Sequence, residues 1–67
     1  MGHKACTITV DGELDDRFHD AFTGFTTVVG DGKSELSGSV ADQAELQGLL
    51  RRLYDLGLTV ISFQVDP

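Results

Sequence analysis

Apolar and polar residues alternate at the start of the chain. From Ala5 to Val10, one face carries Cys6, Ile8 and Val10, and the other face carries Thr7 and Thr9 together with Ala5. This period of two is typical of a half-buried strand. We therefore expect a strand whose core face holds the Cys6, Ile8 and Val10 side chains.

A helical spacing follows this strand. Apolar residues recur every three or four positions along one stripe: Leu14, Phe18, Ala21, Phe22 and Phe25. Asp15 or Asp16 can cap the start of such a helix, and Gly24 can end it in a left-handed conformation. The pattern predicts a first helix over this segment.

A hairpin is predicted next. Asp31 and Gly32 form the dipeptide that two-residue hairpin turns favour. This turn pairs Val29 with Ser34 and directs Val28 outward. One face of the hairpin then carries the residues that we expect toward the core: Phe25, Thr27, Val29, Leu36, Gly38 and Val40.

The second helix has signals at both ends. Asp42 and Glu45 stand three residues apart, as in a capping box, and Gly57 can take the left-handed position after the helix, with Leu58 packing back on Leu53. Its apolar stripe consists of five leucines: Leu46, Leu49, Leu50, Leu53 and Leu56.

A final strand is predicted from Thr59 to Val65, with Ile61, Phe63 and Val65 on its core face. The order strand, helix, strand, strand, helix, strand favours an α+β, ferredoxin-like βαββαβ sandwich. We expect residues 1–67 to form a single domain, with a four-stranded antiparallel sheet in the order 4-1-3-2 and two helices on one face.

Three short motifs in the C-terminal third carry a resemblance: Asp42-Gln43-Ala44, Gly48-Leu49-Leu50 and Asp55-Leu56-Gly57-Leu58. They resemble the C-terminal signature of small, uncharacterised proteins of high-GC Gram-positive bacteria. This sequence has Gln47 where that pattern often has His. The resemblance implies a stand-alone bacterial cytoplasmic domain, and it transfers no catalytic or binding residue.

Composition narrows the classes of partner. Eleven acidic residues against five basic ones give a net charge of −6, which repels nucleic acid and anionic membranes. No apolar run approaches the roughly 20 residues of a membrane helix. A lone Cys6 forms no internal disulfide, which favours a reduced, cytoplasmic setting. A chain of this size buries only about 60% of its surface on folding, so dimerisation is an option.

Candidate chemistry is sparse. His3, Cys6 and His19 lack the spacing of a zinc site, so we interpret them as a core thiol and surface histidines. No nucleophile elbow surrounds a serine. The acidic run near the first helix is interpreted as stabilisation of the helix dipole: Asp11, Glu13, Asp15, Asp16 and Asp20. We therefore predict no enzyme activity, no catalytic residue, no cofactor and no metal.

Two candidate interfaces emerge. On the second helix, four residues lie nearly opposite the leucine stripe: Ala44, Gly48, Arg51 and Asp55. A glycine inside a helix costs about 1 kcal/mol relative to alanine, so Gly48 is either simply tolerated or needed for a close approach. The open sheet face and its edges, with Val28 and Val60, form the second candidate.

The leading hypothesis is a non-enzymatic domain that acts through protein-protein contact, as a homodimer or with another protein. One alternative is a small-molecule-sensing module, because the turn Asp11-Gly12-Glu13 is similar in position to the ligand site of ACT-like regulatory domains. Another is an acidic inhibitor that mimics nucleic acid. Ligand sensing predicts a thermal shift with an amino acid, whereas self-association predicts a mass that depends on concentration.

Overall fold

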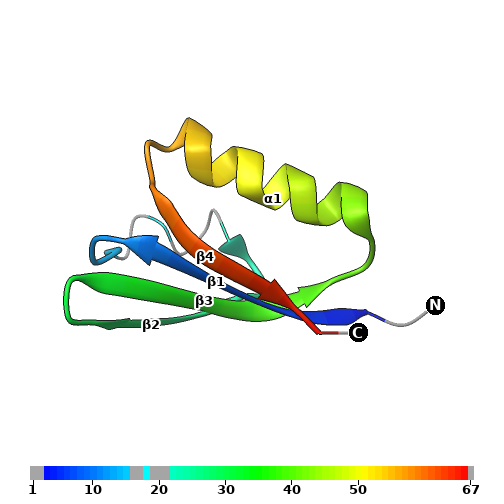
Figure 1. Ribbon diagram of the computed structural model, residues 1–67, viewed down its shortest axis with the longest axis horizontal. Coiled ribbons are helices and arrows are strands. Elements are labelled where there is room, and N and C mark those ends of the chain that lie inside the picture. Colours follow the sequence, from blue (N-terminus) through cyan, green and yellow to red (C-terminus); the bar gives the residue numbers. More distant parts are fainter. Residues whose placement is uncertain (1–2, 16–17, 19–21, 67) are drawn as a thin grey trace.

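The computed structural model describes residues 3–15, 18 and 22–66. Its strands are β1 (Lys4–Asp11), β2 (Thr26–Gly30), β3 (Lys33–Val40) and β4 (Val60–Val65), and its helix is α1 (Gln43–Asp55) (Figure 1). The strands form one sheet in the order β2-β3-β1-β4, and every neighbouring pair is antiparallel. The predicted order 4-1-3-2 is therefore confirmed.

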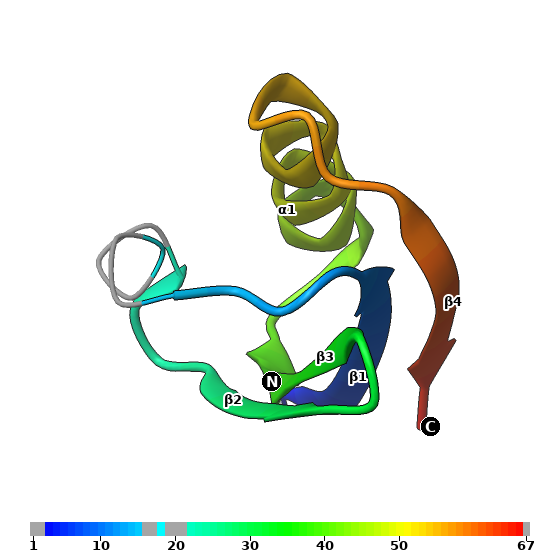
Figure 2. The ribbon, with the colours of Figure 1, turned by 90° about the vertical axis from the view of Figure 1, so that its left-hand side faces the viewer.

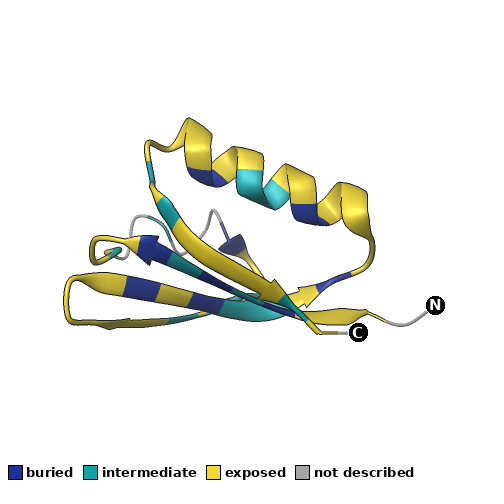
Figure 3. Cartoon of the chain, in the orientation of Figure 1, coloured by how far each residue is buried: buried dark blue, intermediate teal, exposed yellow. Residues whose placement is uncertain are grey.

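The core lies between α1 and the two central strands (Figure 3). Its strand residues come from the predicted faces of β1 and β3: Cys6, Ile8, Val10, Leu36 and Val40. Leu46 and Leu53 of α1 close the core from above. The alternation in the sequence thus fixes which face of the sheet the helix covers, because the other face of β1 is lined by the polar Thr7 and Thr9.

Aromatic side chains from the segment before β2 fill one side of this core. Phe22 is buried, and the ring of Phe25 lies against the backbone of Gly38 in β3. A Cβ atom at Gly38 would stand 2.7 Å from Cδ2 of Phe25, which is closer than carbon atoms approach without displacement. Gly38 therefore makes room for the ring.

The predicted hairpin is confirmed. Val29 lies opposite Ser34, and Gly30 lies opposite Lys33. Asp31 and Gly32 both have positive φ, at 55° and 75°, as a type I′ turn requires. Asparagine, aspartate and glycine tolerate this conformation best, which explains why the dipeptide marks the turn.

Both ends of α1 are also as predicted. The Oδ1 atom of Asp42 accepts a hydrogen bond from the Glu45 amide at 2.9 Å. At the other end Gly57 has φ +80° and donates to the Tyr54 carbonyl, and the Leu58 amide donates to the Leu53 carbonyl at 3.0 Å. These two bonds define a Schellman ending, which satisfies carbonyls that the helix leaves unpaired.

The ferredoxin-like fold with two helices is a wrong prediction. Among the described residues α1 is the one α-helix, and two i→i+3 bonds lie between β1 and β2, from the Phe18 amide to the Asp15 carbonyl and from the Phe25 amide to the Phe22 carbonyl. Gly12 and Gly24 both have positive φ and bound a short stretch. A helix of about 11 residues is marginal without strong packing. Asp16 and Ala21, which belonged to this prediction, lie outside the described residues.

Four apolar residues predicted for the core lie largely outside it. Val29 of β2 is 42% exposed, and Leu56 at the end of α1 is 43% exposed. Ile61 and Phe63 of β4 are 48% and 52% exposed. A β-bulge interrupts the pairing of β1 with β4 between Thr9 and Val10, so the alternation along β4 is broken at Ile61. Phe63 does lie on the helix side of the sheet, opposite Ile8, but α1 leaves it half uncovered.

The boundary of the core is testable with a matched pair of leucine variants. We expect Leu53→Ala to lower the free energy of unfolding by about 2–5 kcal/mol, because Leu53 is fully buried. Leu56→Ala should cost less than about 1 kcal/mol, because much of that side chain already contacts water. Urea denaturation measures both, and equal losses would place Leu56 in the core after all.

Candidate functional site

The turn after β1 is tied to the hairpin by its own hydrogen bonds. The buried Ser34 hydroxyl accepts from the Leu14 amide at 2.9 Å and donates to the Gly12 carbonyl at 2.8 Å. The Gly12 amide donates to the Gly32 carbonyl, and the Gly32 amide donates to Glu13 Oε2. The place that resembled an ACT-like ligand site therefore uses these polar groups to hold the β2-β3 turn.

The residues considered for metal or nucleophilic chemistry do not converge. Cys6 is buried in the sheet, and desolvation raises the pKa of its thiol above the ordinary value. Such a thiol is a poor nucleophile at neutral pH because it stays protonated. His3 is exposed, and His19 lies outside the described residues. Within residues 3–15, 18 and 22–66, no group of three His, Cys, Asp or Glu side chains is placed to hold a metal ion.

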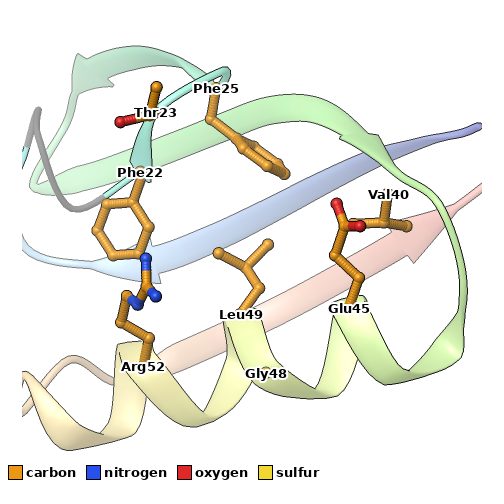
Figure 4. A pocket seen from close by; sticks show the side chains of 8 residues that line it. All are labelled: Phe22, Thr23, Phe25, Val40, Glu45, Gly48, Leu49 and Arg52. Atoms are coloured by element: carbon orange, nitrogen blue, oxygen red, sulfur yellow. The ribbon is translucent and has the colours of Figure 1, made fainter.

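A groove of about 370 Å³ runs between α1 and the segment before β2 (Figure 4). Phe25 and Leu49 point into its centre, while the carboxylate of Glu45 and the guanidinium of Arg52 stand toward its two ends (Figure 4). Gly48 lies on the helical wall, and a Cβ atom there would meet nothing within 4 Å. The groove thus combines an apolar middle with opposite charges at its ends.

The predicted helix interface is exposed throughout: Ala44, Gly48, Arg51 and Asp55. Gly48 has open space around it, so no contact within the described part of the chain requires a glycine at this position. Either reading of Gly48 survives this finding, because the open space is available both to solvent and to a partner.

The predicted sheet interface is not one surface. Val28 is 61% exposed on β2, while Val60 is half-buried opposite Val10 and packs against the core. These residues belong to strands at opposite edges of the sheet, so the structure does not bring them together. Val60 is also on the helix side of the sheet rather than on its open face, which corrects its predicted placement.

β4 is the more apolar of the two sheet edges. Its sequence, Val-Ile-Ser-Phe-Gln-Val, has no charged residue and no proline. Ile61 and Phe63 expose about half of their side chains there, and Phe63, Val65 and Leu46 line an open groove beside the start of α1. In Figure 2, β4 forms the right-hand edge of the sheet, and α1 lies above the sheet.

The pairing of β4 with β1 determines which of its residues direct their backbone N–H and C=O groups toward the open edge. The Asp66 amide donates to the Ala5 carbonyl at 2.9 Å, in the same register that places Gln64 opposite Thr7. Residues that bond to a neighbour alternate along an antiparallel strand. Phe63 and Val65 therefore direct their amide and carbonyl groups away from β1, toward the open edge.

Sequence reasoning missed Ile61 and Phe63 as surface residues. Both were assigned to the core because they fit an apolar alternation. Two signals could have found them: the predicted order placed this strand at a sheet edge, and the strand lacks the charges and prolines that usually protect edges.

Comparison with known proteins supplies one match. A family model described as a domain of unknown function, DUF8691, matches residues 5–64. The matched range extends from β1 into β4, so it includes α1 and the hairpin. No curated protein and no solved structure gives a significant match to the chain. In the described part of the chain, no helix has both the length and the apolar character needed to cross a bilayer.

Two glycines, Gly48 on the groove wall and Gly38 against the Phe25 ring, give opposite expectations for substitution by alanine. Gly48→Ala should raise the free energy of unfolding by about 1 kcal/mol, because alanine favours the helix and its Cβ has space. Gly38→Ala should lower it by about 1–3 kcal/mol, because the Cβ would collide with the Phe25 ring. Thermal and urea denaturation measure both changes, and a neutral Gly38→Ala would contradict the packing of Phe25 on β3.

Proposed function

We propose that this chain, which belongs to the DUF8691 family of domains of unknown function, is a non-enzymatic domain that acts through protein-protein contact and self-associates through β4. A cytoplasmic location is part of the proposal, because the sole cysteine is a buried free thiol.

The observation that supports this function is the unprotected edge of β4. Natural proteins usually blunt an exposed edge strand with charges, prolines, bulges or covering segments. β4 has a bulge at one end and is followed by Asp66 at the other, but no charged residue and no proline lies within the strand itself. The outward backbone groups of Phe63 and Val65 favour pairing with another strand.

Apolar burial would add to this pairing. Phe63 leaves about half of its side chain in contact with water. Covering that half is worth roughly 1 kcal/mol for each copy that takes part. The exposed helix face with Ala44, Gly48, Arg51 and Asp55 remains a proposed second contact for another protein.

Sedimentation equilibrium with two matched lysine variants tests the proposal. The mass of the wild-type chain should rise above 7.2 kDa as concentration increases. Phe63→Lys should stay at one chain, because a charge at this edge opposes pairing. Val28→Lys introduces the same charge at the other edge and should behave as the wild type does.

Circular dichroism of each variant checks that its fold is retained. A wild-type chain that remains at one chain mass throughout would contradict self-association. Association lost with Val28→Lys and kept with Phe63→Lys would move the contact to the β2 edge.

The groove between α1 and Phe25 favours a second candidate function, the sensing of a small amphipathic molecule. Glu45 and Arg52 are seven residues apart, which is about 10 Å along a helix. A short apolar peptide with free ends has an ammonium and a carboxylate at about that separation. The apolar middle of the groove, with Phe25 and Leu49, suits its side chains.

A thermal-shift assay with tri-leucine and with L-leucine tests this candidate. Tri-leucine should stabilise the chain more than L-leucine does, because only the peptide spans both charged ends. Gly48→Leu serves as the control, since a leucine there would project into the groove and should remove the shift. The absence of any shift with millimolar tri-leucine would contradict the candidate. The third hypothesis, mimicry of nucleic acid, stays a prediction from net charge alone.

A further inference from the structure

We infer that two copies of the chain join β4 to β4 in an antiparallel pair, about a two-fold axis through Phe63, and so form one continuous eight-stranded sheet. The inference rests on the proposed self-association, and it names the partner strand and its register. The occupant of the β4 edge is thus a second copy of this chain.

The outward backbone groups of β4 determine which residues can form a hydrogen-bonded pair across the two-fold axis. Phe63 and Val65 face the open edge with their backbone groups, as the Asp66 to Ala5 bond establishes. A Phe63–Phe63 pair across the axis would therefore exchange two hydrogen bonds, with Cα atoms about 5.5 Å apart. Both rings would lie on the helix side, because Phe63 is opposite the buried Ile8.

From Ile61 to Val65 the side chains of β4 match themselves in this register, and Val60 meets Asp66 of the second copy just beyond that range. Opposed residues of an antiparallel pair share a face, so the axis must pass through a residue and not between two. An axis at Phe63 places Ile61 opposite Val65 of the second copy and Ser62 opposite Gln64 of the second copy. Apolar residues then meet apolar ones, and polar residues meet polar ones.

Other axes fit less well. An axis at Ser62 opposes Val60 to Gln64, which sets an apolar side chain against a polar one. An axis at Gln64 shortens the overlap and draws the carboxylate of Asp66 into it. The register about Phe63 keeps charged side chains out of the paired range 61–65, which matters because each copy has a net charge of −6.

The pairing also covers the groove beside the start of α1. Phe63 and Val65 line this groove together with Leu46. A two-fold axis perpendicular to the sheet places both helices on the same side of the joined sheet. The two Phe63 rings then fill the space between the helices, where each ring of a single copy is half exposed.

Disulfide formation between two single-cysteine variants tests the register. Ser62 and Gln64 are exposed and lie on the face away from α1, opposite Thr9 and Thr7. In the proposed dimer Ser62 and Gln64 of different copies form a non-hydrogen-bonded pair with Cα atoms about 4.5 Å apart, within disulfide range. Two copies of either residue alone are about 8 Å apart, beyond that range.

A mixture of Ser62→Cys and Gln64→Cys chains should therefore cross-link at least about tenfold faster than either variant alone. The wild-type chain is the control, because Cys6 is buried and should not cross-link. Faster cross-linking of Ser62→Cys alone would overturn the register in favour of an axis at Ser62, and faster cross-linking of Gln64→Cys alone would move the axis to Gln64.

Failure of the inference and failure of the proposed function give different results. A wild-type dimer by sedimentation without cross-linking of any β4 variant would overturn β4 pairing and leave self-association standing. A single-chain mass at every concentration would overturn both.

Discussion

One helix has to cover a sheet of four strands, and the rest of this structure depends on that constraint. The outer strands of such a sheet are about 14 Å apart, whereas a helix with its side chains is about 10 Å across. α1 covers β1 and β3, which supply the buried strand residues of the core. On the β2 side, Phe22 and Phe25 occupy the space that a second helix would fill. On the β4 side nothing among the described residues replaces it, so Phe63 remains half exposed.

Local signals allowed much of the fold to be predicted from the sequence. The Asp31-Gly32 turn, the Asp42 cap and the Gly57 ending each depend on a few adjacent residues whose backbone preferences are strong. The strand order then follows from chain connectivity and handedness, and it is correct. These features needed no knowledge of which side chains touch across the molecule.

The errors arose where long-range packing decides between similar local patterns. The spacing of Leu14, Phe18 and Phe22 suits a helix, yet the structure has i→i+3 bonds at Phe18 and Phe22. The packing of the Phe25 ring on Gly38, a residue distant in the sequence, could not be predicted from this spacing. The bulge at Ile61 is likewise invisible in a run of alternating residues. Of the two valines in the candidate sheet interface, Val28 was correctly predicted to point outward. The position of Val60 on the helix side could not be predicted, because it depends on the bulge and on the register of β4 against β1.

In the proposed assembly, the net charge of each copy opposes association and the open edge of β4 favours it. Two copies that each have a net charge of −6 repel one another, so added salt should favour association by screening. The paired range 61–65 has no charge of its own, and hydrogen bonds and apolar contact there are insensitive to that screening. An uncharged edge on an acidic chain is thus consistent with contact confined to β4.

The central claim is that another strand completes the β4 edge. Amide hydrogen exchange at several protein concentrations tests this claim most directly. The account predicts that the amides of Phe63 and Val65 become more protected as concentration rises, while those of β2 do not change. Exchange of Phe63 and Val65 that is independent of concentration, or new protection confined to β2, would contradict it.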